Sequence, residues 1–398
     1  MTMRKWVFLF IGLIALALLA YQIPWVNYRL AWRLDAARAY IRGVFDPIQS
    51  LPAPQIFVEP GFAALEPSAT PTGPTPTPAP TATALPASAF LPAPAWEKQD
   101  WNNCGPATLS LYLKYYGWGG DQFDISAEVK PVREDRNVNV DELIYYAQNW
   151  AGWLNSTFRV GGDVEMLKAF LASGIPVQIE AGETIEGDYW PDDDNWAGHY
   201  VLLTGYDDAA QTFTYQDTYK SADQTASYVE LDKFWQQFNR VYILVYLPDQ
   251  EQTVRDILGS NWDEEVNRRN ALEAAQAEIR ADDQNAFAWF NLGMNQVYFE
   301  DYGAAAQSFD VARSLGLPQR MLRYQFGPFF AYYNANRLDD LMDLIDYALR
   351  LTDGSEEVLI WKGWALYRQG DTNGAIAQFR LAQEANPNPA NHSMWNRR

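Results

Sequence analysis

The stretch "QDWNNCGPATLSLYLKYYG", residues 99–117, contains the only cysteine of the chain. Apolar residues recur at helical spacing from Cys104 to Tyr116, and Gly117 can end a helix, so we predict a helix that begins at the thiol. In the first turn of a helix, the macrodipole and the unpaired amide groups stabilise a thiolate, which is the reactive form. The alternative is that Cys104 is a small buried apolar residue. A base that reaches the sulfur decides between the two interpretations.

Only one of the two histidines in the chain suits the role of that base. His392 lies in a polar tail six residues from the C-terminus and is expected to be a solvated bystander. His199 opens the run "HYVLLTGY", and the next run, "TFTYQD", ends at Asp217. With a turn at residues 207–211, antiparallel pairing makes Asp217 the cross-strand neighbour of His199, able to orient the ring. The alternatives are a structural histidine and a strand-end turn residue, and the predicted adjacency favours a catalytic pair.

In the middle of the chain, helical patterns come before strand patterns. Asn139 and Glu142 form a capping-box pattern at the start of "VDELIYYAQNWAG", and Asp163 opens "VEMLKAFLASG", which Gly174 closes. Short runs rich in β-branched and aromatic residues follow: "PVQIEA", "HYVLLTGY", "TFTYQD" and "RVYILVYL". The predicted fold class is therefore α+β, with N-terminal helices and a C-terminal antiparallel sheet.

Together these motifs resemble those of papain-like cysteine peptidases related to the double-glycine leader peptidases that process bacteriocins. The resemblance covers about residues 92–247 and consists of a glutamine, Cys-Gly-Pro, Gly-His and a strand-end aspartate in this chain order. It implies a papain-like domain in which Cys104 is the nucleophile, His199 the base and Asp217 the orienting carboxylate. It also implies that Gln99 donates to the oxyanion beside the backbone amide of Cys104.

The sequence departs from the family pattern at two positions. Gln99 stands one residue closer to the cysteine than in related enzymes, so Asn102 or Asn103 is an alternative oxyanion donor. Thr218 follows Asp217, where related enzymes more usually carry proline. Neither departure removes a member of the implied triad.

The C-terminal third of the chain repeats itself at a displacement of 70 residues, with Gly293, Ala305, Phe309 and Ala312 recurring as Gly363, Ala375, Phe379 and Ala382. This displacement is close to two periods of the tetratricopeptide repeat, which the two segments resemble. A degenerate middle copy contains Tyr332, Leu341 and Ala348. Stacked helix pairs of this kind form a concave scaffold. We predict an all-α repeat domain over residues 261–391 that binds a protein partner or the substrate.

The N-terminal segment has the pattern of a membrane attachment. After Arg4 and Lys5, an uncharged apolar run continues into a segment that also contains polar residues. Together they reach the roughly 20 residues that a bilayer span requires. We predict a signal anchor or transmembrane helix over residues 1–26, with a cleaved secretory signal as the alternative. Arginines at nearly helical spacing predict a juxtamembrane amphipathic segment over residues 27–50. The Pro/Thr/Ala-rich residues 51–95 predict an extended linker.

Charge and composition limit the function. The formal net charge of −20 repels phosphate backbones and argues against a nucleic-acid partner. A long acidic, aromatic loop at residues 180–198 is expected to border the cleft and to favour basic or polar peptides. We expect neither a metal nor a cofactor.

The predicted function is that of a membrane-tethered cysteine peptidase. Its domain, over residues 96–250, would cleave peptide or protein substrates, and the bulk of the chain would be extracytoplasmic on a single-pass membrane protein, or secreted after signal cleavage. One alternative is a catalytically idle peptide-binding module on the same fold. Another is an acyl-transferring or amide-processing thiol enzyme.

Overall fold

The helix predicted at the thiol is present as α3, Cys104–Tyr115, and it is buried along almost its whole length. The computed structural model of the chain describes residues 3–54, 84–132, 138–184, 194–323, 325–352 and 354–387. A helix that is apolar on every side belongs in a protein interior, and α3 packs between the sheet and two further helices. Its contacts therefore determine where Cys104 lies.

An antiparallel sheet forms the other half of this domain, with strand order β2-β7-β3-β4-β5-β6 and β1 paired to β4. The strands are β1 Ser88–Phe90, β2 Asn155–Arg159, β3 Val177–Thr184, β4 Trp196–Asp207, β5 Thr212–Gln216, β6 Gln224–Ser227 and β7 Tyr242–Tyr246. The predicted α+β class is thus confirmed. The sheet also includes β1, which lies within the predicted linker over residues 51–95. Its three residues contain no proline, so their amide groups are free to join the ladder.

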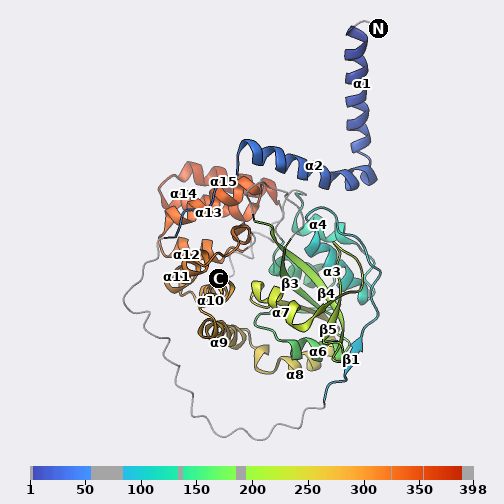
Figure 1. Ribbon diagram of the computed structural model, residues 1–398, viewed down its shortest axis with the longest axis vertical. Coiled ribbons are helices and arrows are strands. Elements are labelled where there is room, and N and C mark those ends of the chain that lie inside the picture. The colour runs from blue at the N-terminus through green and yellow to red at the C-terminus, as the bar shows by residue number, and fades with distance from the viewer. Residues whose placement is uncertain are drawn as a thin grey trace.

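Helices cover both faces of the sheet, and strand alternation assigns each side chain to a face (Figure 1). On one face, Tyr200 and Leu202 pack with α3 and α5. On the other, Val201 and Leu203 pack with α6, α7 and α8. These helices are α4 Gln122–Val129, α5 Val140–Trp150, α6 Val164–Ala172, α7 Tyr228–Trp235 and α8 Glu251–Leu258. The predicted capping box of Asn139 and Glu142 opens α5, and Asp163 caps α6.

A second body consists of helices alone, and its pairs follow the internal repeat. The helices are α9 Glu264–Ala281, α10 Ala286–Tyr298, α11 Tyr302–Ser314, α12 Gly327–Asn334, α13 Leu338–Leu351, α14 Glu356–Arg368 and α15 Thr372–Ala385. A Cβ atom on Gly293 would lie 2.6 Å from the ring of Phe309, and one on Gly363 would lie 2.5 Å from the ring of Phe379. In both copies, glycine thus lets two helices approach closely. The tetratricopeptide assignment itself stays a prediction.

The helical array, α9 to α15, and the sheet domain share a core. Trp196 and Phe238, from the sheet domain, lie in the same apolar cluster as the array helices. Polar contacts border this cluster, including an ion pair in which an Arg240 guanidinium nitrogen lies 2.6 Å from Glu278 Oε1. The Asn267 side chain exchanges hydrogen bonds with the Val160 backbone at 2.8 and 3.1 Å. The array therefore packs directly against the strands that build the site.

The N-terminal helices precede a segment that lies on the array. The two N-terminal helices are α1, Met3–Tyr21, and α2, Pro24–Phe45, and α1 stands clear of the rest (Figure 1). After α2, the Gln319 amide binds the backbone at both Gln49 and Leu51. Residues 55–83, most of the predicted linker, lie outside the described residues.

Among the residues that the structure describes, no helix combines the length and the apolar character needed to cross a membrane. The transmembrane helix predicted over residues 1–26 is therefore not supported.

Candidate active site

Hydrogen bonds from α3 to three strands fix the position of Cys104. The Thr108 hydroxyl donates to the Tyr200 carbonyl of β4 at 3.1 Å. The Tyr112 hydroxyl donates to the Pro176 carbonyl ahead of β3 and accepts from the Val245 amide of β7. Cys104 is the first residue of α3 and is half-buried, as expected for a thiol that borders a cleft.

His199 and Asp217 lie together at the end of the sheet nearest Cys104. His199 Nε2 and Asp217 Oδ1 are 2.9 Å apart, and the two residues are 6% and 1% exposed. Asp217 Oδ1 also accepts from the backbone amides of Tyr219 and Lys220, at 2.8 and 3.0 Å. These amides hold the carboxylate in one orientation toward the ring.

The strand register differs from the predicted one. Leu202 pairs with Gln216, so extending the ladder places Asp217 opposite Val201, diagonal to His199 rather than directly across from it. A register shift between Leu203 and Gly205 contributes to this difference. Diagonal neighbours remain within reach of long side chains, so the predicted contact forms although the predicted direct pairing is wrong.

The same ring contacts the thiol. The interaction with the Cys104 side chain is one of the contributions that raise the pKa of His199, so the two side chains lie near each other. Because Nε2 is engaged by Asp217, the nitrogen that faces the sulfur is Nδ1. The imidazole therefore has the Asp217 carboxylate hydrogen-bonded on one side and Cys104 near it.

Electrostatics favour the charged forms of His199 and Asp217. Burial lowers the pKa of His199, but its hydrogen bonds to Asp217 and Cys104 outweigh burial, so this pKa lies well above its ordinary value. Burial raises the pKa of Asp217, but the hydrogen bond and the attraction to His199 outweigh burial and lower it. Near neutral pH, the site thus holds a carboxylate beside an imidazolium.

The three candidate oxyanion donors are in different surroundings. Gln99 is 5% exposed and forms two hydrogen bonds with Thr218. The backbone amide of Gln99 donates to the Thr218 carbonyl, and the side-chain Oε1 of Gln99 accepts from the Thr218 hydroxyl, both at 2.9 Å. Asn103 Nδ2 is committed to Gln122 Oε1 at 2.9 Å. Asn102 Nδ2 is buried and has no hydrogen-bond partner among the described residues. Of the three, Asn102 thus has a buried side-chain donor without a partner among the described residues, and the Oε1 atom of Gln99 is held by Thr218.

Sequence reasoning missed Glu180, a buried carboxyl beside the thiol. Glu180 lies on β3 directly opposite Tyr200. Burial raises its pKa well above the ordinary value, a hydrogen bond with Tyr200 partly offsets burial, and the proximity of Cys104 adds to the rise. The available sequence signal was a carboxylate inside the strand-like run "PVQIEA".

The loop predicted to border the cleft is described only at its ends, since residues 185–193 lie outside the described residues. At its C-terminal end, Asp194 Oδ2 accepts from the backbone amide of Arg320 at 3.0 Å. Arg320 belongs to the array, in the turn Gln319–Arg323. The array thus holds the chain just before the strand that carries His199.

A group of acidic side chains lies where the two bodies meet. The carboxylate oxygens of Glu142, Glu356 and Glu357 lie within 4.8 Å of one another, and this is the one such group among the described residues. Glu142 Oε2 accepts from the Asn139 amide, and Glu356 Oε1 accepts from Asn386 Nδ2. Because these bonds serve helix capping and packing, we assign the group no metal.

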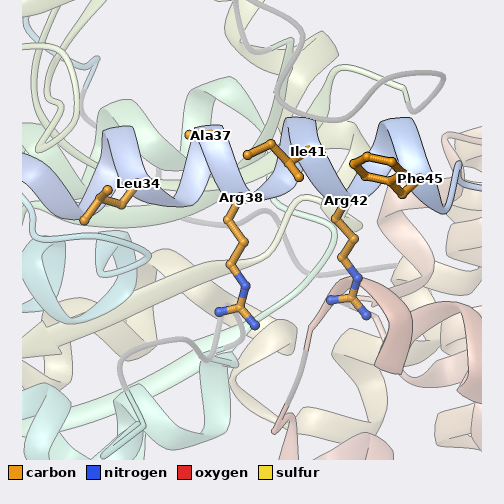
Figure 2. Close-up of a pocket in the computed structure, with 6 residues that line it drawn as sticks. All are labelled: Leu34, Ala37, Arg38, Ile41, Arg42 and Phe45. Carbon is orange, nitrogen blue, oxygen red and sulfur yellow. The ribbon is translucent and has the colours of Figure 1, made fainter. Parts of the chain in front are cut away.

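A shallow concavity of about 660 Å³ lies on α2 (Figure 2). It is lined by Leu34, Ala37, Arg38, Ile41, Arg42 and Phe45. No residue of the sheet domain lines it, so it is not the place where a substrate meets Cys104. His392 lies outside the described residues.

The fold and the site together define a class, a cysteine peptidase of α+β type. Residues 90–244 match the family described as Peptidase_C39 like. This match confirms the predicted resemblance of this part of the chain to C39-like cysteine peptidases.

Three solved structures show some similarity to the chain. A C39-like peptidase from Bacillus anthracis is 18% identical with a TM-score of 0.31, and the match covers 40% of this chain and 96% of that one. A double glycine motif protease from an AMS/PCAT transporter, solved with its leader peptide, is 17% identical with a TM-score of 0.30, covering 40% and 94%. Xylellain, a cysteine protease from Xylella fastidiosa, is 14% identical with a TM-score of 0.30, covering 41% and 87%. No curated protein matches the chain.

The carboxylate of Asp217 gives one prediction that needs no substrate. Asp217→Asn keeps an oxygen that can accept from an imidazolium N–H but removes the negative charge, so the pKa of His199 should fall. NMR titration of the imidazole resonances measures this directly, because the chain has two histidines. A pKa of His199 that is the same in both proteins would contradict the assigned pairing.

Proposed function

We propose that the domain cleaves peptide bonds through Cys104, His199 and Asp217, with Gln99 donating to the oxyanion. The observation that supports this proposal most strongly is the buried His199–Asp217 hydrogen bond at 2.9 Å, with Cys104 near the same imidazole. A thiol needs a base that is itself held in one orientation, and this chain supplies both.

The proposed reaction has two stages. The Cys104 sulfur attacks the carbonyl carbon of the scissile bond, an S–C bond forms, and the carbonyl electron pair moves to the oxygen. When the oxyanion collapses, the C–N bond breaks and the His199 imidazolium gives its proton to the leaving amine. Water then attacks the thioester with His199 as base, which releases the carboxylic acid and restores the sulfur.

The alkylation of the only cysteine tests this proposal. Iodoacetamide should label Cys104 at about pH 6, where an ordinary thiol reacts slowly, because the imidazolium of His199 lies beside the sulfur. Cleavage of a peptide library should fall in proportion to the labelled fraction, measured by mass spectrometry. A fully labelled protein that cleaves as before would exclude Cys104 as the nucleophile.

Two parts of the predicted function stay predictions from the sequence. One is the attachment of the chain to a membrane with its bulk outside the cytoplasm. The other is the binding of a partner or substrate by the helical array. Exposed aromatic side chains support the second, namely Trp364 and Tyr367 on α14.

A further inference from the structure

Thr218, the residue after Asp217, is hydrogen-bonded to Gln99, the residue that the family resemblance implies as the oxyanion donor. The backbone amide of Gln99 donates to the Thr218 carbonyl, and the Thr218 hydroxyl donates to Gln99 Oε1, both at 2.9 Å. Thr218 is fully buried and Gln99 is 5% exposed, so water competes little for either bond. Two bonds between the same pair of residues fix both the backbone and the side chain of Gln99.

The hydroxyl determines which way the carboxamide of Gln99 points. A carboxamide is planar, with its oxygen and nitrogen on opposite branches. With Oε1 held by the Thr218 hydroxyl, Nε2 lies on the opposite branch. Loss of that hydroxyl removes a bond that favours this orientation over the flipped one, which would present an oxygen where an oxyanion needs a donor.

One short segment thereby organises both halves of the site. Asp217 orients His199 through its side chain, and its own carbonyl accepts from Trp96 Nε1 at 2.9 Å. Thr218 orients Gln99. The segment before α3 and the end of β5 are thus held together at consecutive residues.

We propose that Thr218 is a positioning residue of the oxyanion hole, which holds the Gln99 carboxamide with Nε2 toward the carbonyl oxygen attacked by Cys104. This inference rests on the proposed function. In this role, Thr218 helps to stabilise the negative charge that develops on the carbonyl oxygen in the transition state. It does not change the reactivity of the Cys104 sulfur.

The expected loss of kcat in a Thr218 variant is smaller than the loss caused by removing an oxyanion donor entirely. Loss of one oxyanion donor typically lowers kcat by about 10²-fold to 10³-fold. Thr218→Val removes the hydroxyl but keeps the side-chain volume and the backbone bond, so Gln99 is loosened and not deleted. We expect kcat to fall by about 10-fold to 30-fold with little change in KM, because the oxyanion exists only in the transition state.

The experiment compares Thr218→Val with a matched control, Thr204→Val. Thr204 is also buried, and its hydroxyl also binds a glutamine, accepting from Gln216 Nε2 at 3.0 Å. Each variant is measured for kcat and KM, for inhibition by a peptide aldehyde, whose adduct carries an oxyanion, and for alkylation by iodoacetamide, which forms none. Thr218→Val should weaken the aldehyde by the same factor as kcat and leave alkylation unchanged, and Thr204→Val should change neither. Thr218→Ser, which keeps a hydroxyl, should recover most of kcat.

Specific results would overturn the proposal. Slower alkylation in Thr218→Val would mean that Thr218 acts through the neighbouring Asp217, and an unchanged kcat would mean that the hydroxyl is not needed. A double-mutant cycle gives a second criterion: Thr218→Val should have no further effect in a Gln99→Ala background, and additive losses would exclude action through Gln99. Failure of the peptidase proposal is recognised separately, because the unsubstituted protein would then neither cleave peptides nor react with iodoacetamide at about pH 6.

Discussion

Cys104→Ala is expected to lower kcat/KM for peptide cleavage by about 10⁵-fold or more, the largest effect of any single substitution in the chain. The reason is that no other thiol is present, so no side chain can form the thioester in its place. What remains is the slow attack of water in a site that still binds and polarises the carbonyl. The measurement is the initial rate of cleavage of a peptide identified from the library.

Two comparisons make the Cys104→Ala result specific. Cys104 is half-buried and begins its helix, so alanine should leave the unfolding temperature nearly unchanged. Cys104→Ser should be almost as inactive, because an imidazolium is protonated on both ring nitrogens and cannot accept the proton of the hydroxyl, so the alkoxide does not form. Activity within about 10-fold of the unsubstituted protein in either variant would show that the nucleophile lies elsewhere.

The parts of the fold that local sequence determines were predictable. Helix α3 follows from apolar spacing and a glycine stop, and α5 from a capping box, since both signals lie within one or two helical turns. The shorter helices α4 and α7 were missed because each has eight residues, too few for a clear periodicity. Their N-caps, Asp121 and Ser227, were the signals available.

The contact of His199 with Asp217 was predictable for a different reason. A turn between two strands fixes which residues come near each other, and a difference of two positions keeps both side chains on the same face and within reach, whereas a difference of one would place them on opposite faces. The register itself was not predictable because the irregularity between Leu203 and Gly205 has no local sequence signature beyond a glycine.

Contacts between segments that are distant in the sequence could not be predicted from the sequence. Thr218 and Gln99 are 119 residues apart, and nothing near either residue indicates the other. The same holds for Arg240, which binds Glu278 of the array. Such pairs depend on how whole elements pack, so a departure such as threonine after Asp217 could be noticed in the sequence but not explained.

The array has a physical connection to the catalytic residues through β4. Its helices share a core with Trp196, the first residue of that strand, and Asp194 just before it is bound by Arg320. His199 follows three residues after Trp196. The position of the imidazole therefore depends on packing against the array as well as on Asp217, and removing the array is expected to expose this end of the strand.

His199→Ala is expected to lower kcat/KM by about 10³-fold to 10⁴-fold and to slow the alkylation of Cys104 at about pH 6. Both effects share a cause, because the same ring carries the proton for the leaving amine and places positive charge beside the sulfur. Added imidazole should restore part of the activity, since the substitution leaves a space between Asp217, Tyr219 and the sulfur. His392→Ala is the matched control and should leave both rates unchanged. Normal alkylation in His199→Ala would mean that the sulfur is activated without the imidazole, and the His199–Asp217 pair would then not be the source of its reactivity.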